Sequence, residues 1–131
     1  MDYTFYMLPL SVFKDAVYGS DDEGSFVELF GRKMRRFHIV GSIAAMEMNS
    51  ESGSGYIIVD DTFSSVLVHF QSSMFRTVEN LQKGDLVEVL GDVDTYNESI
   101  TLSMQNIRGI DLSRYSFNKL ESIKNLQAIS K

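Results

Sequence analysis

The stretch that decides the fold is Leu86-Val-Glu-Val-Leu-Gly-Asp-Val-Asp-Thr-Tyr96, followed by Asn97-Glu-Ser99 and Ile100-Thr-Leu-Ser-Met-Gln-Asn-Ile107. Its first part alternates valines with carboxylates, which is typical of a strand with one buried and one wet face. The polar break predicts a hairpin turn of two or three residues. Gly91 stands in mid-strand, where a small barrel needs a bend or bulge to close. We therefore expect a β-hairpin that belongs to a small closed barrel.

Three further strands are expected on the N-terminal side of this hairpin, over residues 37–47, 56–60 and 65–70. A polar run at 49–55 and a tight Asp-Asp-Thr turn at 60–62 separate them, and Gly41 is expected to bend the first strand as Gly91 bends the fourth. A helical or irregular piece then leads to the hairpin. The predicted fold class is all-β with flanking helices, a five-stranded OB-fold barrel over residues 35–112 plus a C-terminal helix. The commonest role of such a barrel is to hold single-stranded nucleic acid.

Two further regions flank the barrel. Residues 1–34 are predicted as an N-terminal extension, with a strand or short helix at 9–17 and a polar loop at 19–25. Residues 113–131 are predicted as a helix capped by Ser113 or Ser116. Its apolar residues recur every three positions and so wind diagonally around the helix instead of forming a heptad seam. We predict that these residues contact a partner, the alternative being that they pack only on the chain's own barrel. They are Phe117, Leu120, Ile123, Leu126 and Ile129.

The third strand, at 65–70, is apolar on both faces. A strand of a one-layer barrel should show polar side chains to water unless something covers them. The cover could be a nucleobase, a partner subunit or the N-terminal segment, and the sequence leaves these three possibilities open.

The composition argues against enzymatic and metal chemistry. The chain of 131 residues has no cysteine and two histidines, so neither a disulfide nor a convincing zinc site is expected. No recognisable catalytic residues accompany either histidine, and no nucleotide-binding motif is present. We predict no catalytic residues, no metal, no cofactor and no small-molecule substrate. Neither a secretory signal nor a membrane span is recognisable, so an intracellular location is expected, in the nucleus if the source is eukaryotic and otherwise in the cytoplasm.

Charge is the feature that opposes a role in nucleic-acid binding. Twelve basic residues face 18 acidic ones, a net charge of −6, whereas phosphate-binding proteins are normally basic. A DNA contact must therefore depend on stacking, on a local patch or on a more basic partner. The concentrated positive charge at residues 32–36 could contact phosphates or simply balance the acidic residues 21–23. Cations predicted to contribute to a phosphate path are Arg35, Arg36, Arg76, Lys83 and Arg108.

The order of these segments resembles a known family. The segments that carry the resemblance best are Ile39-Val-Gly41, Val59-Asp-Asp-Thr62 and Val87-Glu-Val-Leu-Gly-Asp-Val93, followed by the C-terminal helix. Over residues 36–131 the chain resembles the OB-fold domain of the middle subunit of replication protein A and its Stn1-like and archaeal relatives. That resemblance implies two aromatic residues that stack on bases, at positions matching Phe70 and Tyr96 here. It also implies that the terminal helix joins a helix bundle with other subunits.

The resemblance and the residue patterns together predict a non-enzymatic OB-fold subunit of a hetero-oligomeric, single-stranded DNA-binding complex in genome maintenance. The setting could be replication, repair or telomere protection. DNA binding by the chain alone is expected to be weak, because Asp92 and Asp94 share a face with Tyr96 and repel phosphates. The alternative is a purely structural OB-fold subunit of a helicase–topoisomerase type of complex that makes no direct DNA contact.

Overall fold

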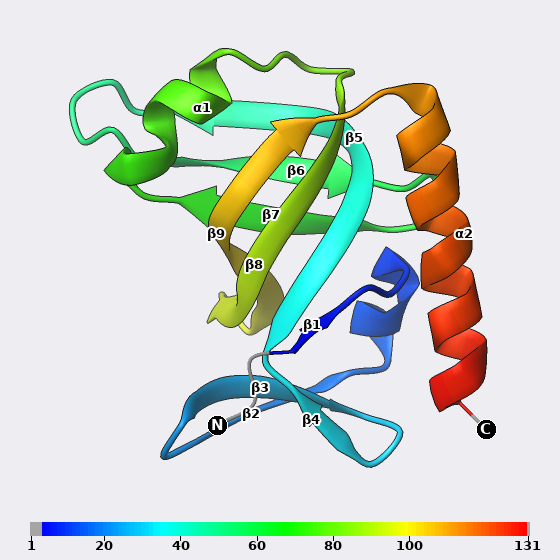
Figure 1. Ribbon diagram of the computed structural model, residues 1–131. Helices are drawn as coiled ribbons and strands as arrows, with labels where there is room; N and C mark the ends of the chain where they lie inside the picture. The colour runs from blue at the N-terminus through cyan, green and yellow to red at the C-terminus, as the bar shows by residue number, and fades with distance from the viewer. Residues whose placement is uncertain (1–3, 131) are drawn as a thin grey trace.

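A computed structural model describes residues 4–130 and contains the predicted five-stranded barrel (Figure 1). Hydrogen bonding runs in the order β5-β6-β7-β9-β8, and β8 also pairs with β5 to close the barrel. All neighbours are antiparallel except β7 and β9. The prediction of an OB-fold barrel is thus confirmed. Its strands are β5 (Arg36–Met48), β6 (Gly55–Asp60), β7 (Ser65–Phe70), β8 (Leu86–Tyr96) and β9 (Ser99–Gly109).

Glycine and turn residues shape the barrel. The β8–β9 register shifts between Leu90 and Gly91, which is the expected bulge. Gly41 acts differently, because a Cβ there would lie 2.7 Å from the carbonyl oxygen of Asp60. Its role is to let β5 cross β6 closely. The hairpin turn has two residues, Asn97 and Glu98, with φ of 50° and 67°.

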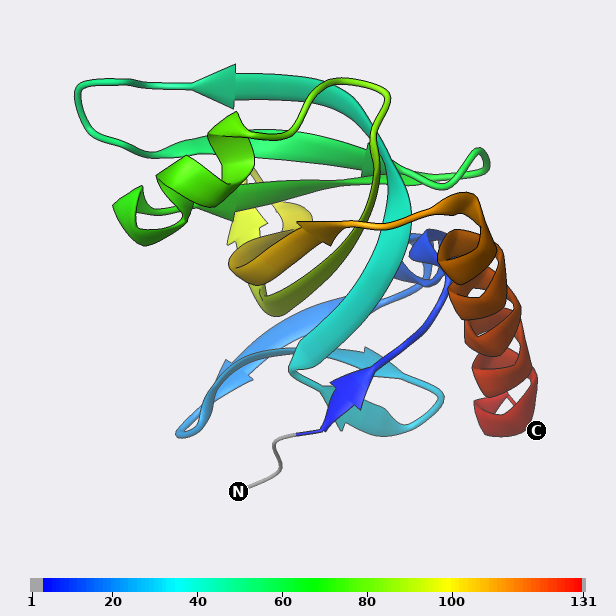
Figure 2. The same ribbon diagram turned by 45° about the horizontal axis from the view of Figure 1, so that its top comes forward.

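Residues 4–34 are more ordered than the sequence suggests. β1 (Phe5–Tyr6) pairs in parallel with β5, and the short 3-10 helix η1 (Leu10–Lys14) follows. A second sheet of β2 (Val17–Asp21), β3 (Gly24–Leu29) and β4 (Arg32–Met34) lies below the barrel in Figures 1 and 2. The predicted loop at 19–25 is wrong, because these residues form the β2–β3 hairpin. The sequence Gly-Ser-Asp-Asp-Glu-Gly-Ser has almost no intrinsic strand preference, so the strands of this hairpin form because they pair with each other.

The hydrophobic core is continuous from the barrel into this second sheet. Residues 4–34 are therefore built into the same core rather than appended to it. The predicted domain limits at residues 1 and 131 lie outside the described residues. The buried side chains that the N-terminal region contributes are Leu8, Leu10, Val12, Val27, Leu29 and Met34.

Two helical pieces complete the fold. The 3-10 helix η2 (Ser72–Met74) and α1 (Phe75–Glu79) lead from β7 to β8 and bury Val78 in the core. Helix α2 (Leu112–Ile129) stands beside the barrel in Figure 1. The predicted serine cap is wrong: Asp111 caps α2, and its side chain accepts a 2.8 Å hydrogen bond from the Arg114 amide. None of the helices in the described part of the chain is long and apolar enough to cross a membrane.

Candidate nucleic-acid and partner interfaces

The outer face of β6, β7 and the end of β8 forms a groove of about 640 Å³. Two tyrosines, Tyr56 and Tyr96, line it together with Leu67, His69 and Asp94, and we call it the tyrosine groove. Leu67 and His69 are the outward side chains of β7, whose cover the sequence leaves open. Both are half-buried in this groove. Its volume lies in the range of ordinary small-ligand pockets.

One of the two predicted stacking residues, Phe70, is buried. Phe70 borders the groove, but its ring is only 1% exposed and belongs to the core. Alternation along β7 turns Val66, Val68 and Phe70 inward. The prediction that Phe70 stacks on a base is therefore wrong. Tyr96 is 63% exposed, so its stacking role stays a prediction.

Tyr56 is the groove residue that sequence reasoning missed. Its hydroxyl donates a 2.8 Å hydrogen bond to Glu47 Oε2 on the neighbouring strand. This hydrogen bond and the charge of Glu47 raise the pKa of Tyr56, so the phenol is neutral at ordinary pH. The outward position of Tyr56 could have been found from the inward alternation of Ile57 and Val59.

A second polar pair fixes the floor of the groove. His69 Nε2 lies 3.1 Å from Asp94 Oδ2, and the Thr95 amide donates a 2.8 Å hydrogen bond to Asp94 Oδ1. The carboxylate is thus held from both sides, while 45% of the side chain stays exposed. The negative charge of Asp94 is therefore held at a fixed position on the floor of the tyrosine groove.

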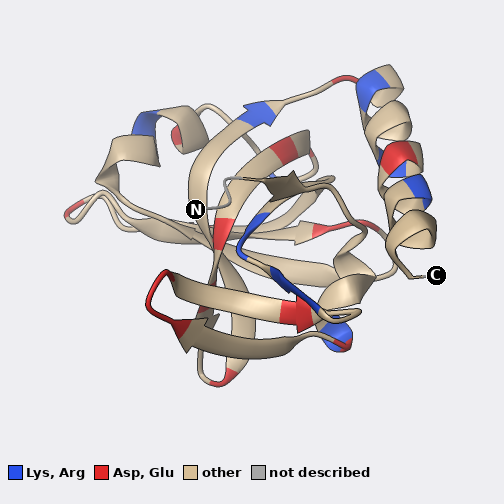
Figure 3. Ribbon diagram, turned by 60° about the horizontal axis from the view of Figure 1, so that its bottom comes forward, with Lys and Arg blue, Asp and Glu red and all other residues tan. Residues whose placement is uncertain are grey.

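Most of the predicted DNA-binding cations are engaged within the chain. Arg36 Nε lies 3.3 Å from Asp92 Oδ1, and Arg108 pairs with Glu88. Arg76 and Lys83 are exposed, and neither forms an ion pair with another described residue. Figure 3 shows basic and acidic positions interspersed over several elements rather than a continuous basic strip. The predicted phosphate path therefore has two free members, Arg76 and Lys83.

The basic run at 32–36 largely balances the acidic β2–β3 turn, one of the two alternatives that the sequence left open. Arg35 Nη2 lies 2.6 Å and Lys33 Nζ 3.3 Å from Asp21 Oδ2. Arg35 Nε also lies 3.6 Å from Glu23. The hydrogen bond from Arg35 holds the pKa of Asp21 well below its usual range. These pairs brace the second sheet.

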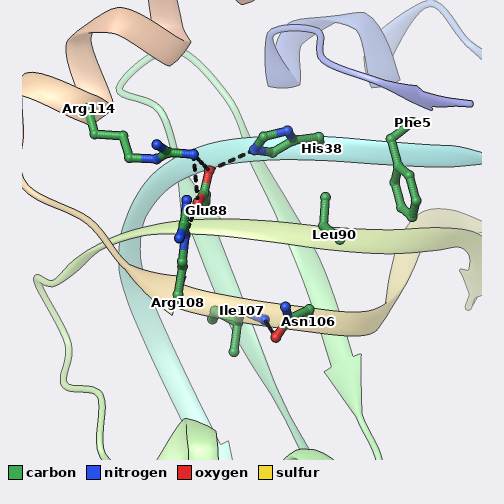
Figure 4. Close-up of a pocket in the computed structure, with 8 residues that line it drawn as sticks. All are labelled: Phe5, His38, Glu88, Leu90, Asn106, Ile107, Arg108 and Arg114. Atoms are coloured by element: carbon green, nitrogen blue, oxygen red, sulfur yellow. Dashed lines mark hydrogen bonds and ion pairs between the residues drawn. The ribbon is translucent and has the colours of Figure 1, made fainter.

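Glu88 is a buried carboxylate, as Asp61 is, although the alternation along β8 predicts that Glu88 faces solvent. Figure 4 shows His38, Arg108 and Arg114 directed at its carboxylate. His38 Nε2 lies 2.9 Å from Oε2, and Asn118 Nδ2 of α2 donates to the same oxygen at 3.2 Å. Burial raises the pKa of Glu88, but the hydrogen bonds from His38 and Arg108 outweigh it and keep the pKa below the ordinary value.

This cluster explains how α2 is attached to the barrel. Arg114 Nη2 lies 3.3 Å from Glu88 Oε1, and the amide of Asn118 binds the same carboxylate. Farther along, Lys119 Nζ donates a 3.2 Å hydrogen bond to the Asp61 carbonyl. The first half of α2 thus contacts the barrel through polar groups, and Asn118 and Ser122 are its buried residues.

The apolar residues of α2 consequently divide between two faces. Phe117, Leu120 and Ile123 are 62%, 52% and 41% exposed, and Ile123 also lines a cleft against the barrel. Leu126 and Ile129 are half-buried and pack against the chain's own core. The diagonal stripe thus begins facing solvent and ends facing the barrel. The partner contact of the stripe stays a prediction, and Leu126 and Ile129 also take part in the chain's own packing.

Phe63, in the β6–β7 turn, extends the exposed apolar face of α2. It is 76% exposed and lines a cleft of about 220 Å³ together with Ile123 and Leu126. Lys119 Nζ lies 5.3 Å from the centroid of its ring. A partner that covers Ile123 can therefore reach Phe63 as well.

Metal binding finds no support in the described residues. Across positions 4–130, no group of three or more His, Asp or Glu side chains is placed to hold a metal ion. Asp61 accepts hydrogen bonds from the amides of Leu10, Phe63 and Ser64. Its carboxylate therefore organises a turn.

Comparison with solved structures supports the fold over the whole chain. A chain of the S. pombe Stn1–Ten1 complex matches 97% of this chain over 94% of its own length, with a TM-score of 0.83 and 19% identity. A chain of a replication protein A heterotrimer bound to single-stranded DNA matches 98% over 99%, with a TM-score of 0.81 and 16% identity. A chain from the yeast Stn1 and Ten1 structure matches 76% over 56%, with a TM-score of 0.61 and 14% identity. No family model matches the sequence, and no curated protein does.

Proposed function

We propose that this chain is a non-enzymatic OB-fold subunit of a hetero-oligomeric complex that binds single-stranded DNA in genome maintenance. Replication, repair and telomere protection are the settings in which such a subunit would act. In a eukaryote the location would be the nucleus, and otherwise the cytoplasm. The barrel would contribute a minor DNA contact at the tyrosine groove, and α2 would contribute the main contact with a partner.

The observation that carries the proposal is the outward face of α2. Phe117, Leu120 and Ile123 are large apolar side chains that the chain's own barrel leaves in solvent. In the first half of α2, polar residues occupy the side of the helix that touches the barrel, which is the reverse of an ordinary surface helix. Exposed apolar area of this kind marks a protein contact. The whole-chain likeness to subunits of two OB-fold complexes supports the same function.

A second candidate function has its own support. Arg35, Arg36 and Arg108 are paired with carboxylates of the same chain, and the net charge is −6. Neutralising phosphates with cations supplies most non-specific affinity for DNA. A purely structural OB-fold subunit, which binds other proteins through α2 and leaves DNA to them, is therefore the alternative.

The test begins with co-expression of the full chain and the OB-fold chains of its own genome that match the partner subunits of those complexes. We expect a stable complex by size-exclusion chromatography with light scattering. Leu120→Glu places a charge at the centre of the outward face and should abolish the complex. Gln127→Glu, an exposed change of equal charge on the same helix, is the matched control and should leave it intact.

Fluorescence anisotropy with a single-stranded oligonucleotide then separates the two candidates. In the DNA-contacting subunit, Tyr96→Ala should weaken DNA binding by the complex by roughly 1–3 kcal/mol. In the structural alternative the complex forms, and Tyr96→Ala has no effect on DNA affinity. A full chain that remains a monomer with every such partner contradicts both candidates.

A further inference from the structure

The tyrosine groove carries a chemical preference of its own. Asp94 is the one acidic residue among the described residues that line the groove, and the Nε2 of His69 already faces its carboxylate at 3.1 Å; the other polar residues of the lining besides the two tyrosines are Ser54, Gln71 and Thr95. An ionised carboxylate can only accept hydrogen bonds. A negative charge repels phosphates, but it attracts the N–H groups of a base. Such a groove is therefore better suited to the edge of a base than to the backbone of the strand.

Asp94 is held in place rather than free to rotate. The contact with His69 involves Oδ2, and the hydrogen bond from the Thr95 amide involves Oδ1. Two carboxylate oxygens offer about four lone-pair positions, so each oxygen retains capacity for another donor. With 45% of the side chain exposed, that capacity faces the groove and solvent. The site is thus a pre-oriented pair of acceptors.

The four bases differ in what they offer such a pair. Guanine presents two adjacent donors, N1–H and the 2-amino group, which match the two oxygens of a carboxylate in a bidentate arrangement. Thymine presents one N–H between two carbonyl oxygens that a carboxylate repels. Adenine and cytosine each present one amino group beside a ring nitrogen that accepts. Only guanine pairs both oxygens without placing two acceptors against each other.

The groove also has the means to hold the plane of a base. The ring of Tyr96 is largely exposed at the rim, and Tyr56 stands on the opposite strand with its hydroxyl bound to Glu47. A volume of about 640 Å³ accommodates a nucleotide. Stacking on a tyrosine is tolerant of sequence, so selectivity has to come from the polar floor.

We propose that Asp94 makes the tyrosine groove selective for guanine in single-stranded nucleic acid. This inference rests on the proposed function, because it assumes that the groove receives a base. Tyr96 supplies the stacking surface, and His69 positions the carboxylate. The negative charge of the groove weakens binding to any single strand, whereas the hydrogen bonds of Asp94 favour strands that present guanine.

The test compares oligothymidines of about a dozen nucleotides that carry guanine, adenine, cytosine, thymine or hypoxanthine at one central position. Anisotropy is measured with the full chain at low salt. The oligonucleotide with guanine should bind roughly tenfold more tightly than the one with thymine, as expected for a bidentate contact. Hypoxanthine lacks the 2-amino group and should lose most of that gain.

Variants identify the residue responsible. Asp94→Asn replaces one acceptor with a donor, so it should weaken binding to the guanine oligonucleotide by roughly tenfold and, by removing a negative charge, strengthen binding to the thymine one. Asp92→Asn is the matched control. It removes the same charge two residues earlier on the same face of β8, where Asp92 binds Gln105 and Arg36, and should shift all five affinities alike.

Equal affinities for all five oligonucleotides would overturn the inference and leave a DNA-binding subunit standing. An Asp94→Asn variant that shifts all five alike would also overturn it, because the carboxylate would then act only through its charge. No binding to any oligonucleotide, by the chain or by its complex, would overturn both the inference and the DNA contact of the proposed function.

Discussion

At the scale of single residues, the decisive question for function is which aromatic rings are free to meet a base. Phe70 and Tyr96 are both aromatic residues at the ends of barrel strands, yet one is buried and the other exposed. The difference follows from alternation along β7 and from the close approach of Phe70 to Gly55, its partner on β6. A Cβ on Gly55 would lie 2.9 Å from the tip of the Phe70 ring, so the ring fills the space that this glycine leaves.

This distinction predicts opposite outcomes for similar substitutions. Phe70→Ala should lower the free energy of unfolding by roughly 3–5 kcal/mol, because it opens a cavity in the core. Tyr96→Ala should change stability by less than about 1 kcal/mol while weakening DNA binding by the complex. Chemical denaturation and anisotropy measure the two effects, and Phe30→Ala, an exposed ring on the second sheet, controls for loss of an aromatic surface. A stable Phe70→Ala variant would show that the ring is not a core residue.

Glu88 predicts a pH dependence of stability. Its pKa in the folded state lies below the ordinary value of 4.5, so the unfolded chain binds the proton more readily. The stabilisation is therefore present at neutral pH and is lost as the pH falls below the ordinary value and through the folded one. Glu88→Gln should cost about 1–3 kcal/mol near neutral pH, and the difference from the unmodified chain should shrink in acid.

Denaturant unfolding over a pH series measures this difference. Asp21 also has a lowered pKa, so Asp21→Asn is the control that removes a separate part of the pH dependence. A difference between Glu88→Gln and the unmodified chain that stays constant from neutral to acidic pH would exclude the ionised carboxylate as its source.

At the scale of elements, the β8–β9 hairpin contains a residue that its turn type disfavours. A two-residue turn with both φ angles positive favours Asn-Gly, whereas this turn has Asn97 followed by Glu98 at a φ of 67°. A non-glycine residue pays roughly 1–2 kcal/mol in the left-handed region. Tyr96 stands directly before this turn, so the turn also sets the rim of the tyrosine groove.

Replacement of Glu98 by glycine should therefore raise the free energy of unfolding by up to about 1 kcal/mol, since relief of strain is partly offset by a more flexible unfolded chain. Thermal or denaturant unfolding gives the value. Asn97→Gly is the matched comparison and should gain less, because asparagine tolerates this conformation better. A loss of stability in Glu98→Gly would mean that the glutamate side chain makes a favourable contact in the turn.

At the scale of the whole molecule, the barrel and its order could be predicted from sequence because period-two patterns and turn residues point to the same strands. The second sheet could not, since β2 gains its structure from pairing with β3 rather than from local preference. The outward position of Tyr96 was predicted and that of Tyr56 was missed, because inward and outward positions depend on register. The Glu88 cluster was missed because its members come from four separate elements.

Two strand pairings that hold the barrel closed, β5 with β8 and β7 with β9, differ in length. β5 and β8 pair continuously from Arg36 with Asp92 to Ser42 with Leu86, whereas β7 and β9 meet in parallel only at Val68 with Leu102 and at His69 with Ser103. So short a seam is where a native barrel opens first, and backbone amides beside it should exchange with deuterium at a lower free energy than those of β5. His69 belongs to this short pairing of β7 with β9 and also lines the tyrosine groove. A ligand bound in the groove would therefore stabilise the pairing of the two strands and slow that exchange.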